Sequence, residues 1–152
     1  MKIYHRHSIR LTGYDYTQNG CYFLTICTRN RECLFGEIQN AEMFLSNIGE
    51  KVNDCWQEIP NHFPQIVLHE YVIMPNHIHL LLALNNTGGR IVSAPTVIGS
   101  LKRFASRQAK SDIWQKGFYD HVIRDDEDLK IKWDYIEGNP AQWLLNKDEY
   151  SE

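Results

Sequence analysis

Apolar and polar positions along this chain of 152 residues follow two rhythms, one typical of strands and one typical of helices. Short apolar or aromatic runs predict four β-strands, over residues 22–28, 66–73, 77–84 and 118–124. Apolar residues spaced three or four apart predict amphipathic helices over residues 43–59 and 96–110. A third helix is expected to begin at the acidic run 125–128, since negative side chains stabilise the start of a helix.

The order of these elements is strand, helix, strand, strand, helix, strand, helix. This order predicts an α+β fold of the ferredoxin-like sandwich type, with an antiparallel four-stranded sheet and an additional C-terminal helix. The first two helices are expected to cover one face of the sheet and to leave the other for a ligand or another element. No linker or repeat interrupts the pattern, so residues 1–152 are expected to form a single domain.

The composition narrows the possible surroundings and partners of the chain. No apolar stretch approaches the roughly 20 residues of a membrane span, and the N-terminus lacks the apolar core of a signal peptide. We therefore expect a cytoplasmic protein without a membrane partner. The four cysteines lack the Cys-x-x-Cys spacing of zinc knuckles and are expected to be reduced.

The net charge of −3 hides an uneven distribution. Residues 101–116 carry five basic side chains against one acidic one, a local charge of +4, whereas residues 32–58 carry one against six, a local charge of −5. Such a basic segment can bind a phosphate backbone. It can equally be a solvated helix face. The cations expected to contact phosphates are Arg6, Arg10, Lys102, Arg103 and Arg107.

Two histidines, His77 and His79, stand at the head of an apolar run. Residues two apart on a strand point to the same face, so both imidazoles are expected to leave the sheet together while Ile78 points into the core. Two adjacent neutral imidazoles form half of a divalent-metal site. The competing interpretation is a solvated polar face without a ligand.

The predicted third helix offers residues that could complete such a site. Tyr135 and Asn139 are four residues apart and thus share a helix face. A carbonyl oxygen from Asn139 could bind a metal, and a tyrosine phenoxide can attack phosphorus. Asn139 before Pro140 is also typical of an N-cap, which predicts a helix break here and a further helix over residues 141–147. Tyr119 is the alternative nucleophile, because composition does not choose among eight tyrosines.

Five segments in this order, nearly the full length of the chain, resemble the REP-associated tyrosine transposases, a branch of the single-tyrosine HUH transposases. The His77-Ile78-His79 stretch resembles the HUH motif, which is histidine, a bulky hydrophobic residue and histidine. The last segment resembles a Tyr-x-x-x-Asn-Pro motif. The segments span residues 6–16, 22–28, 72–79, 114–124 and 134–140.

The resemblance implies a ferredoxin-like fold and the cleavage and joining of single-stranded DNA through a 5′-phosphotyrosine. It implies that His77 and His79 bind Mg²⁺ or Mn²⁺ with Asn139 as third ligand, and that Tyr135 is the nucleophile. It further implies hairpin-containing DNA as partner and a possible homodimer. Two alternatives stay open: a non-catalytic nucleic-acid-binding module on the same fold, and a hydrolytic metal phosphodiesterase that uses water instead of tyrosine.

Overall fold

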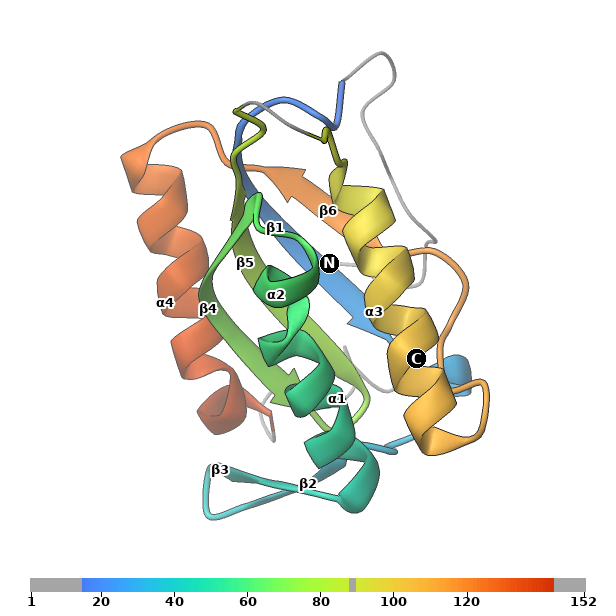
Figure 1. Cartoon of the computed structure of the whole chain (residues 1–152). Helices are drawn as coiled ribbons and strands as arrows, with labels where there is room; N and C mark the ends of the chain where they lie inside the picture. The colour runs from blue at the N-terminus through green and yellow to red at the C-terminus, as the bar shows by residue number, and fades with distance from the viewer. Residues whose placement is uncertain (1–14, 88–89, 144–152) are drawn as a thin grey trace.

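The computed structural model describes residues 15–87 and 90–143 and contains a four-stranded antiparallel sheet (Figure 1). The strand order is β4-β5-β1-β6, so the two central strands come from distant parts of the chain. This order and the antiparallel pairing confirm the predicted ferredoxin-like α+β fold. The strands are β1 (Gly20–Cys27), β4 (Ile66–Met74), β5 (His77–Leu84) and β6 (Tyr119–Val122).

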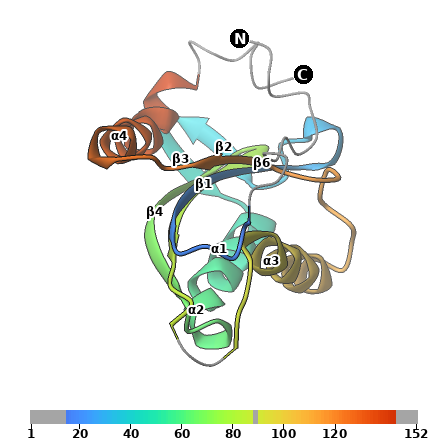
Figure 2. The ribbon, with the colours of Figure 1, turned by 90° about the horizontal axis from the view of Figure 1, so that it is seen from above.

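Helices lie on both sides of this sheet, as Figure 2 shows. On one face lie α1 (Asn47–Gln57), the short α2 (Ile59–His62) and α3 (Ala94–Ala109), over the main apolar core. On the other face lies α4 (Asp126–Gln142), over a smaller core built around Phe23, Leu81 and Ile136. The face that the sequence left open is therefore covered by the C-terminal helix.

The structure contains a hairpin of two short strands that the sequence pattern did not predict. The strand β2 (Gly36–Gln39) pairs with β3 (Glu42–Leu45), and β3 takes the place of the first turn of the helix predicted over residues 43–59. Their two-residue turn, Asn40-Ala41, has positive φ at both positions, as a type I′ turn requires. The helix α1 begins after Ser46, whose hydroxyl accepts a hydrogen bond from the N–H of Gly49. A short 3₁₀ turn, η2 (Arg29–Arg31), follows β1.

The helix break predicted at Asn139 is wrong, because α4 continues through Pro140 to Gln142. Pro140 has no N–H to donate to the carbonyl of Ile136, so one helical hydrogen bond is missing there. The amide nitrogen of Asn139 instead donates to the carbonyl of Tyr135, at 2.9 Å, which adds a bond within the preceding turn. Of the helix predicted over residues 141–147, positions 144–147 lie outside the described residues.

Two predictions from composition can be compared with the structure. All four cysteines are described and all are free thiols, as expected. Over residues 15–87 and 90–143, no helix is both long and apolar enough to cross a membrane. The assignment of residues 1–152 to one domain stays a prediction, since both ends lie outside the described ranges.

Candidate active site between β5 and α4

The histidine pair lies at the start of β5, under α4. Ile78, between the two histidines, belongs to the main core on the opposite face, so the predicted alternation is correct. His77 and His79 are only 2% and 1% exposed, and their ring centroids are 4.7 Å apart. This burial contradicts the interpretation of the pair as a solvated polar face.

Burial sets the protonation of both imidazoles. It lowers the pKa of His79 from 6.5 to about 3, and the positive charge of Lys132 adds to this effect. Burial also lowers the pKa of His77 well below 6.5, with further contributions from His79 and Arg31. Both rings are therefore neutral at pH 7, which is the form that binds a metal ion.

Hydrogen bonds orient both rings through their Nδ1 atoms. His77 Nδ1 lies 2.7 Å from the Asn76 amide oxygen, which only accepts, so Nδ1 carries the proton. The Asn76 amide nitrogen donates to the Arg31 carbonyl at 3.3 Å, in agreement with this orientation. His79 Nδ1 lies 2.9 Å from the hydroxyl of Thr25. Both Nε2 atoms are buried, and that of His79 has no hydrogen-bond partner among the described residues. The pair therefore fits half of a metal site.

Asn139 is the candidate for a third ligand. Within the described ranges, no three His, Cys, Asp or Glu side chains come together in a way that could hold a metal. A third ligand from these ranges would thus be of another type, such as an amide oxygen. Asn139 is 1% exposed on α4, one turn after Tyr135, and its amide nitrogen is bonded to the Tyr135 carbonyl.

Of the two candidate nucleophiles, Tyr135 lies against the histidine pair. Its ring centroid is 5.1 Å from that of His79, in an edge-on arrangement, and 6.0 Å from that of Phe23. Tyr119 pairs in register with Thr25, which pairs with His79 on the next strand. Two strand spacings place the backbones of Tyr119 and His79 about 10 Å apart. The packing therefore favours Tyr135.

The predicted phosphate contacts do not gather around the histidines. Lys102, Arg103 and Arg107 lie on α3, across the sheet from α4. The ammonium of Lys102 donates to two backbone carbonyls of the loop before β6, those of Gln115 at 3.0 Å and Gly117 at 2.7 Å. Arg103 and Arg107 are exposed. Arg6 and Arg10 lie outside the described residues.

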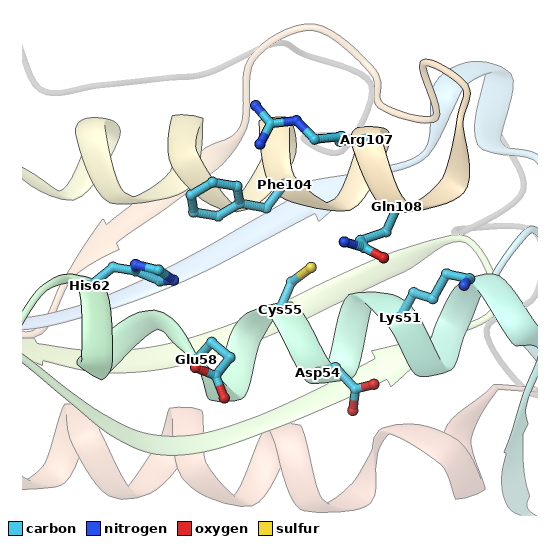
Figure 3. A pocket seen from close by; sticks show the side chains of 8 residues that line it. All are labelled: Lys51, Asp54, Cys55, Glu58, His62, Phe104, Arg107 and Gln108. Carbon is cyan, nitrogen blue, oxygen red and sulfur yellow. The ribbon is translucent and has the colours of Figure 1, made fainter.

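Arg107 also borders a cleft of about 350 Å³ between α1 and α3 (Figure 3). Side chains of both charge signs line it, so its charges favour neither an anion nor a cation. Its lining comprises Lys51, Asp54, Cys55, Glu58, His62, Phe104, Arg107 and Gln108. The cleft lies on the face away from the histidine pair and has no part in the candidate site.

Sequence reasoning missed three residues of the site: Thr25, Asn76 and Lys132. Asn76 could have been noticed, because a side-chain acceptor directly before His77 can orient its ring. Thr25 becomes visible only through the register of β1 with β5. Lys132 is recognisable as a site residue only once α4 is placed on the sheet.

Comparisons with known proteins agree with this fold. No family model matches the chain. An uncharacterised protein of Haemophilus influenzae is 39% identical, over 93% of this chain and 91% of its own length. A second H. influenzae protein, provisionally named a REP-associated tyrosine transposase, is 29% identical over 84% of this chain and 74% of its own length. The REP-associated tyrosine transposase of Escherichia coli is 24% identical, over 89% and 76%.

Solved structures share the fold. A REP-associated tyrosine transposase bound to a REP hairpin superposes with a TM-score of 0.69 at 21% identity, over 88% of this chain and 74% of that one. A provisionally named transposase of Deinococcus radiodurans gives 0.52 at 18% identity, over 85% and 95%. Together with the named sequence relatives, these findings show that the chain is related in sequence and in fold to the REP-associated tyrosine transposases, which are enzymes.

Proposed function

We propose that this protein is a metal-dependent endonuclease and strand transferase that cleaves and rejoins single-stranded DNA at hairpin-containing sites. The observation that carries the proposal is the packing of the Tyr135 ring against His79, with ring centroids 5.1 Å apart. A nucleophile thus stands beside two buried, neutral imidazoles, and the strands and helix that hold them form a packed layer. The similarity to proteins named as REP-associated tyrosine transposases supports the same reaction.

Tyr135 is the nucleophile of the proposed step. Its phenol loses a proton to solvent, and its oxygen forms a bond to the phosphorus while the bond from phosphorus to the 3′-oxygen breaks. The upstream strand leaves with a 3′-hydroxyl after taking a proton from solvent, and the downstream strand stays attached as a 5′-phosphotyrosine. A phenoxide leaves phosphorus more readily than an alkoxide, so attack by a free 3′-hydroxyl can rejoin the strands.

His77, His79 and Asn139 are the proposed ligands of Mg²⁺ or Mn²⁺. Such an ion, when bound, polarises the phosphate and stabilises the charge that develops on it. Two features of the site favour binding of this ion. Burial keeps the imidazoles unprotonated, and the Nδ1 contacts with Asn76 and Thr25 fix both ring orientations.

The proposed DNA partner contains a hairpin, because a structural relative was solved with a REP hairpin. On the α3 side, a cleft of about 570 Å³ is lined by four cations, Lys102, Arg103, Arg107 and Lys116, against one carboxylate, that of Asp112. We assign phosphate contacts to these cations, and to Arg6 and Arg10, since cations near a polyanion gain from counterion release. The reaction is placed in the cytoplasm, and a homodimer is part of the proposal.

The decisive experiment incubates the protein with single-stranded, hairpin-containing oligonucleotides and Mn²⁺, followed by a denaturing gel. We expect a covalent protein–DNA adduct that is absent in Tyr135→Phe and present in Tyr119→Phe. Cleavage without an adduct would indicate a hydrolytic phosphodiesterase, and binding without cleavage a non-catalytic module. An adduct that survives Tyr135→Phe but not Tyr119→Phe would identify Tyr119 as the nucleophile.

A further inference from the structure

Lys132 lies on the same side of α4 as the candidate nucleophile. Lys132, Tyr135 and Asn139 follow one another at intervals of three and four residues, so they form one line along the helix. The ammonium of Lys132 is 5.2 Å from the ring centroid of Phe23. The Phe23 ring also stacks on His79, with 5.4 Å between centroids, and meets the edge of Tyr135. Lys132 is therefore part of the cluster around the candidate active site.

The direction of α4 places Lys132 at one end of this cluster. Lys132 lies over Phe23, Tyr135 lies beside His79, and Trp143 stacks near His77 with ring centroids 6.3 Å apart. The helix α4 thus runs antiparallel to β5, from the β5 position that pairs with Phe23 toward the start of β5 (Figure 1). Lys132 consequently approaches the nucleophile from the side opposite His77.

The charge of Lys132 is not neutralised by a carboxylate. Within residues 15–87 and 90–143, Lys132 forms no salt bridge. The carboxylate one turn before it, Asp128, accepts hydrogen bonds from His121 and from the backbone N–H of Arg124. Lys130 is different, because it is 76% exposed and pairs with Asp134 at 2.8 Å. The ammonium of Lys132 instead lies over the ring of Phe23, which stacks on His79.

An ammonium close to a metal ion held by these ligands would be unfavourable unless an anion shared the site, since like charges repel at short range. The anion that the proposed reaction brings to Tyr135 is a phosphodiester. We propose that Lys132 is a catalytic residue that donates a hydrogen bond to a non-bridging oxygen of the scissile phosphate, beside the attacking Tyr135. This inference rests on the proposed function. The ammonium keeps its proton throughout, and its charge offsets the negative charge that gathers on those oxygens.

A binding experiment tests the phosphate contact without any reaction. In a Tyr135→Phe background and without metal, the affinity for a short oligothymidylate is measured by fluorescence anisotropy over a range of salt concentrations. Each phosphate contact on a single strand contributes about 0.7 to the slope of log K against log salt. We expect Lys132→Gln to reduce this slope by about 0.7 and Lys132→Arg to retain it. Lys130→Gln, which removes the same charge from the solvent side of α4, is the matched control and is expected to retain the slope.

The rate of adduct formation tests the catalytic part. A hydrogen bond to a charged group is worth about 1.5–3 kcal/mol, so Lys132→Gln is expected to slow adduct formation about 10- to 100-fold. Lys132→Arg is expected to recover most of the rate, and Mn²⁺ affinity measured by calorimetry is expected to rise in Lys132→Gln, because a repelling cation has been removed. A merely structural role would not raise that affinity.

The outcomes separate this inference from the proposed function. An unchanged salt slope or an unchanged rate in Lys132→Gln, with the wild-type adduct present, overturns the role of Lys132 alone. An equal loss in Lys130→Gln also overturns it, because the effect would then be general charge attraction. A wild-type protein that forms no adduct overturns both.

Discussion

The hydrogen bond between Thr25 and His79 allows a specific prediction, because one substitution, Thr25→Val, removes it. Thr25→Val replaces the hydroxyl with a methyl group of nearly the same size, in a side chain that is 5% exposed. The hydroxyl lies 2.9 Å from His79 Nδ1, so the substitution leaves that ring nitrogen buried without its partner. The shape of the core stays the same, which isolates the effect of the hydrogen bond.

The expected loss of stability follows from two opposing contributions. A buried polar group left without a partner costs about 1–3 kcal/mol. The added methyl group recovers about 0.8 kcal/mol through apolar burial. The net loss is then about 0.2–2.2 kcal/mol in the free energy of unfolding, and each kcal/mol lowers Tm by about 2–4 °C in a chain of this length. A Tm lower by up to about 9 °C is therefore expected in thermal unfolding followed by circular dichroism.

The same substitution is expected to weaken metal binding. Loss of a partner that orients a ligating imidazole typically costs about 10- to 100-fold in metal affinity. Mn²⁺ titration by calorimetry measures this directly, without DNA and without turnover. Thr25→Ser is the matched comparison, because it keeps the hydroxyl and loses only a methyl group. It is expected to lower Tm to a similar extent and to lose much less Mn²⁺ affinity.

A Thr25→Val variant that bound Mn²⁺ as tightly as the wild type, beside a Thr25→Ser variant that did not, would contradict this role of the hydroxyl. That result would mean that the methyl group, rather than the hydroxyl, positions His79. An unchanged Tm in Thr25→Val would show that the hydroxyl–imidazole contact contributes nothing to stability.

Three further predictions concern stability. The pKa of His79 is about 3 in the folded protein and about 6.5 in the unfolded chain. The free energy of unfolding is therefore highest above pH 6.5 and falls as the pH drops toward 3, by up to about 1.4 kcal/mol per pH unit. Urea unfolding between pH 4 and 7 should show a smaller decline in His79→Gln than in the wild type. Burial raises the pKa of Asp128, but hydrogen bonds from the Arg124 N–H and from His121 outweigh it and hold this pKa below its usual value. Asp128→Asn should therefore lower Tm at pH 7, and the difference in Tm should shrink as the pH falls through the pKa of Asp128. Gly138→Ala, which meets no atom within 4 Å in α4, should stabilise the protein by up to about 1 kcal/mol, whereas Gly49→Ala, whose new Cβ would collide with a backbone carbonyl, should destabilise it; thermal unfolding of both variants checks the contrast, which equal shifts would contradict.

The main helices and strands, and the common direction of the two histidines, can be predicted from the order of the residues alone. Both follow from local periodicity: residues two apart on a strand share a face, and residues three or four apart share a helix side. The strands predicted at 66–73 and 77–84 and the helix at 96–110 therefore agree with the structure to within a few residues. The family resemblance added the roles of Tyr135 and Asn139, which spacing alone left open and which remain predictions.

Predictions from local sequence pattern were wrong at two places, where the same residues fit more than one conformation. Phe44 fits the helical pattern of residues 43–59, yet it lies on β3 and is exposed. The Asn40-Ala41 turn joins β2 to β3 without the usual Asn-Gly signal of a hairpin. Asn139-Pro140 has the signature of a helix start, yet α4 passes through it. Packing of α4 against β4 and β5 and the side-chain bond of Asn139 favour the continuous helix.

Which residues meet in the site depends on how the strands and helices pack in the folded chain. The register of β1 with β5 places Thr25 on His79, and the docking of α4 places Lys132 and Tyr135 around Phe23. The cations of α3 lie on the face of the sheet opposite α4 and the histidines, which their charge pattern in the sequence did not indicate. These contacts join residues tens of positions apart. Strand pairing and helix docking set them, and neither leaves a periodic trace in the chain.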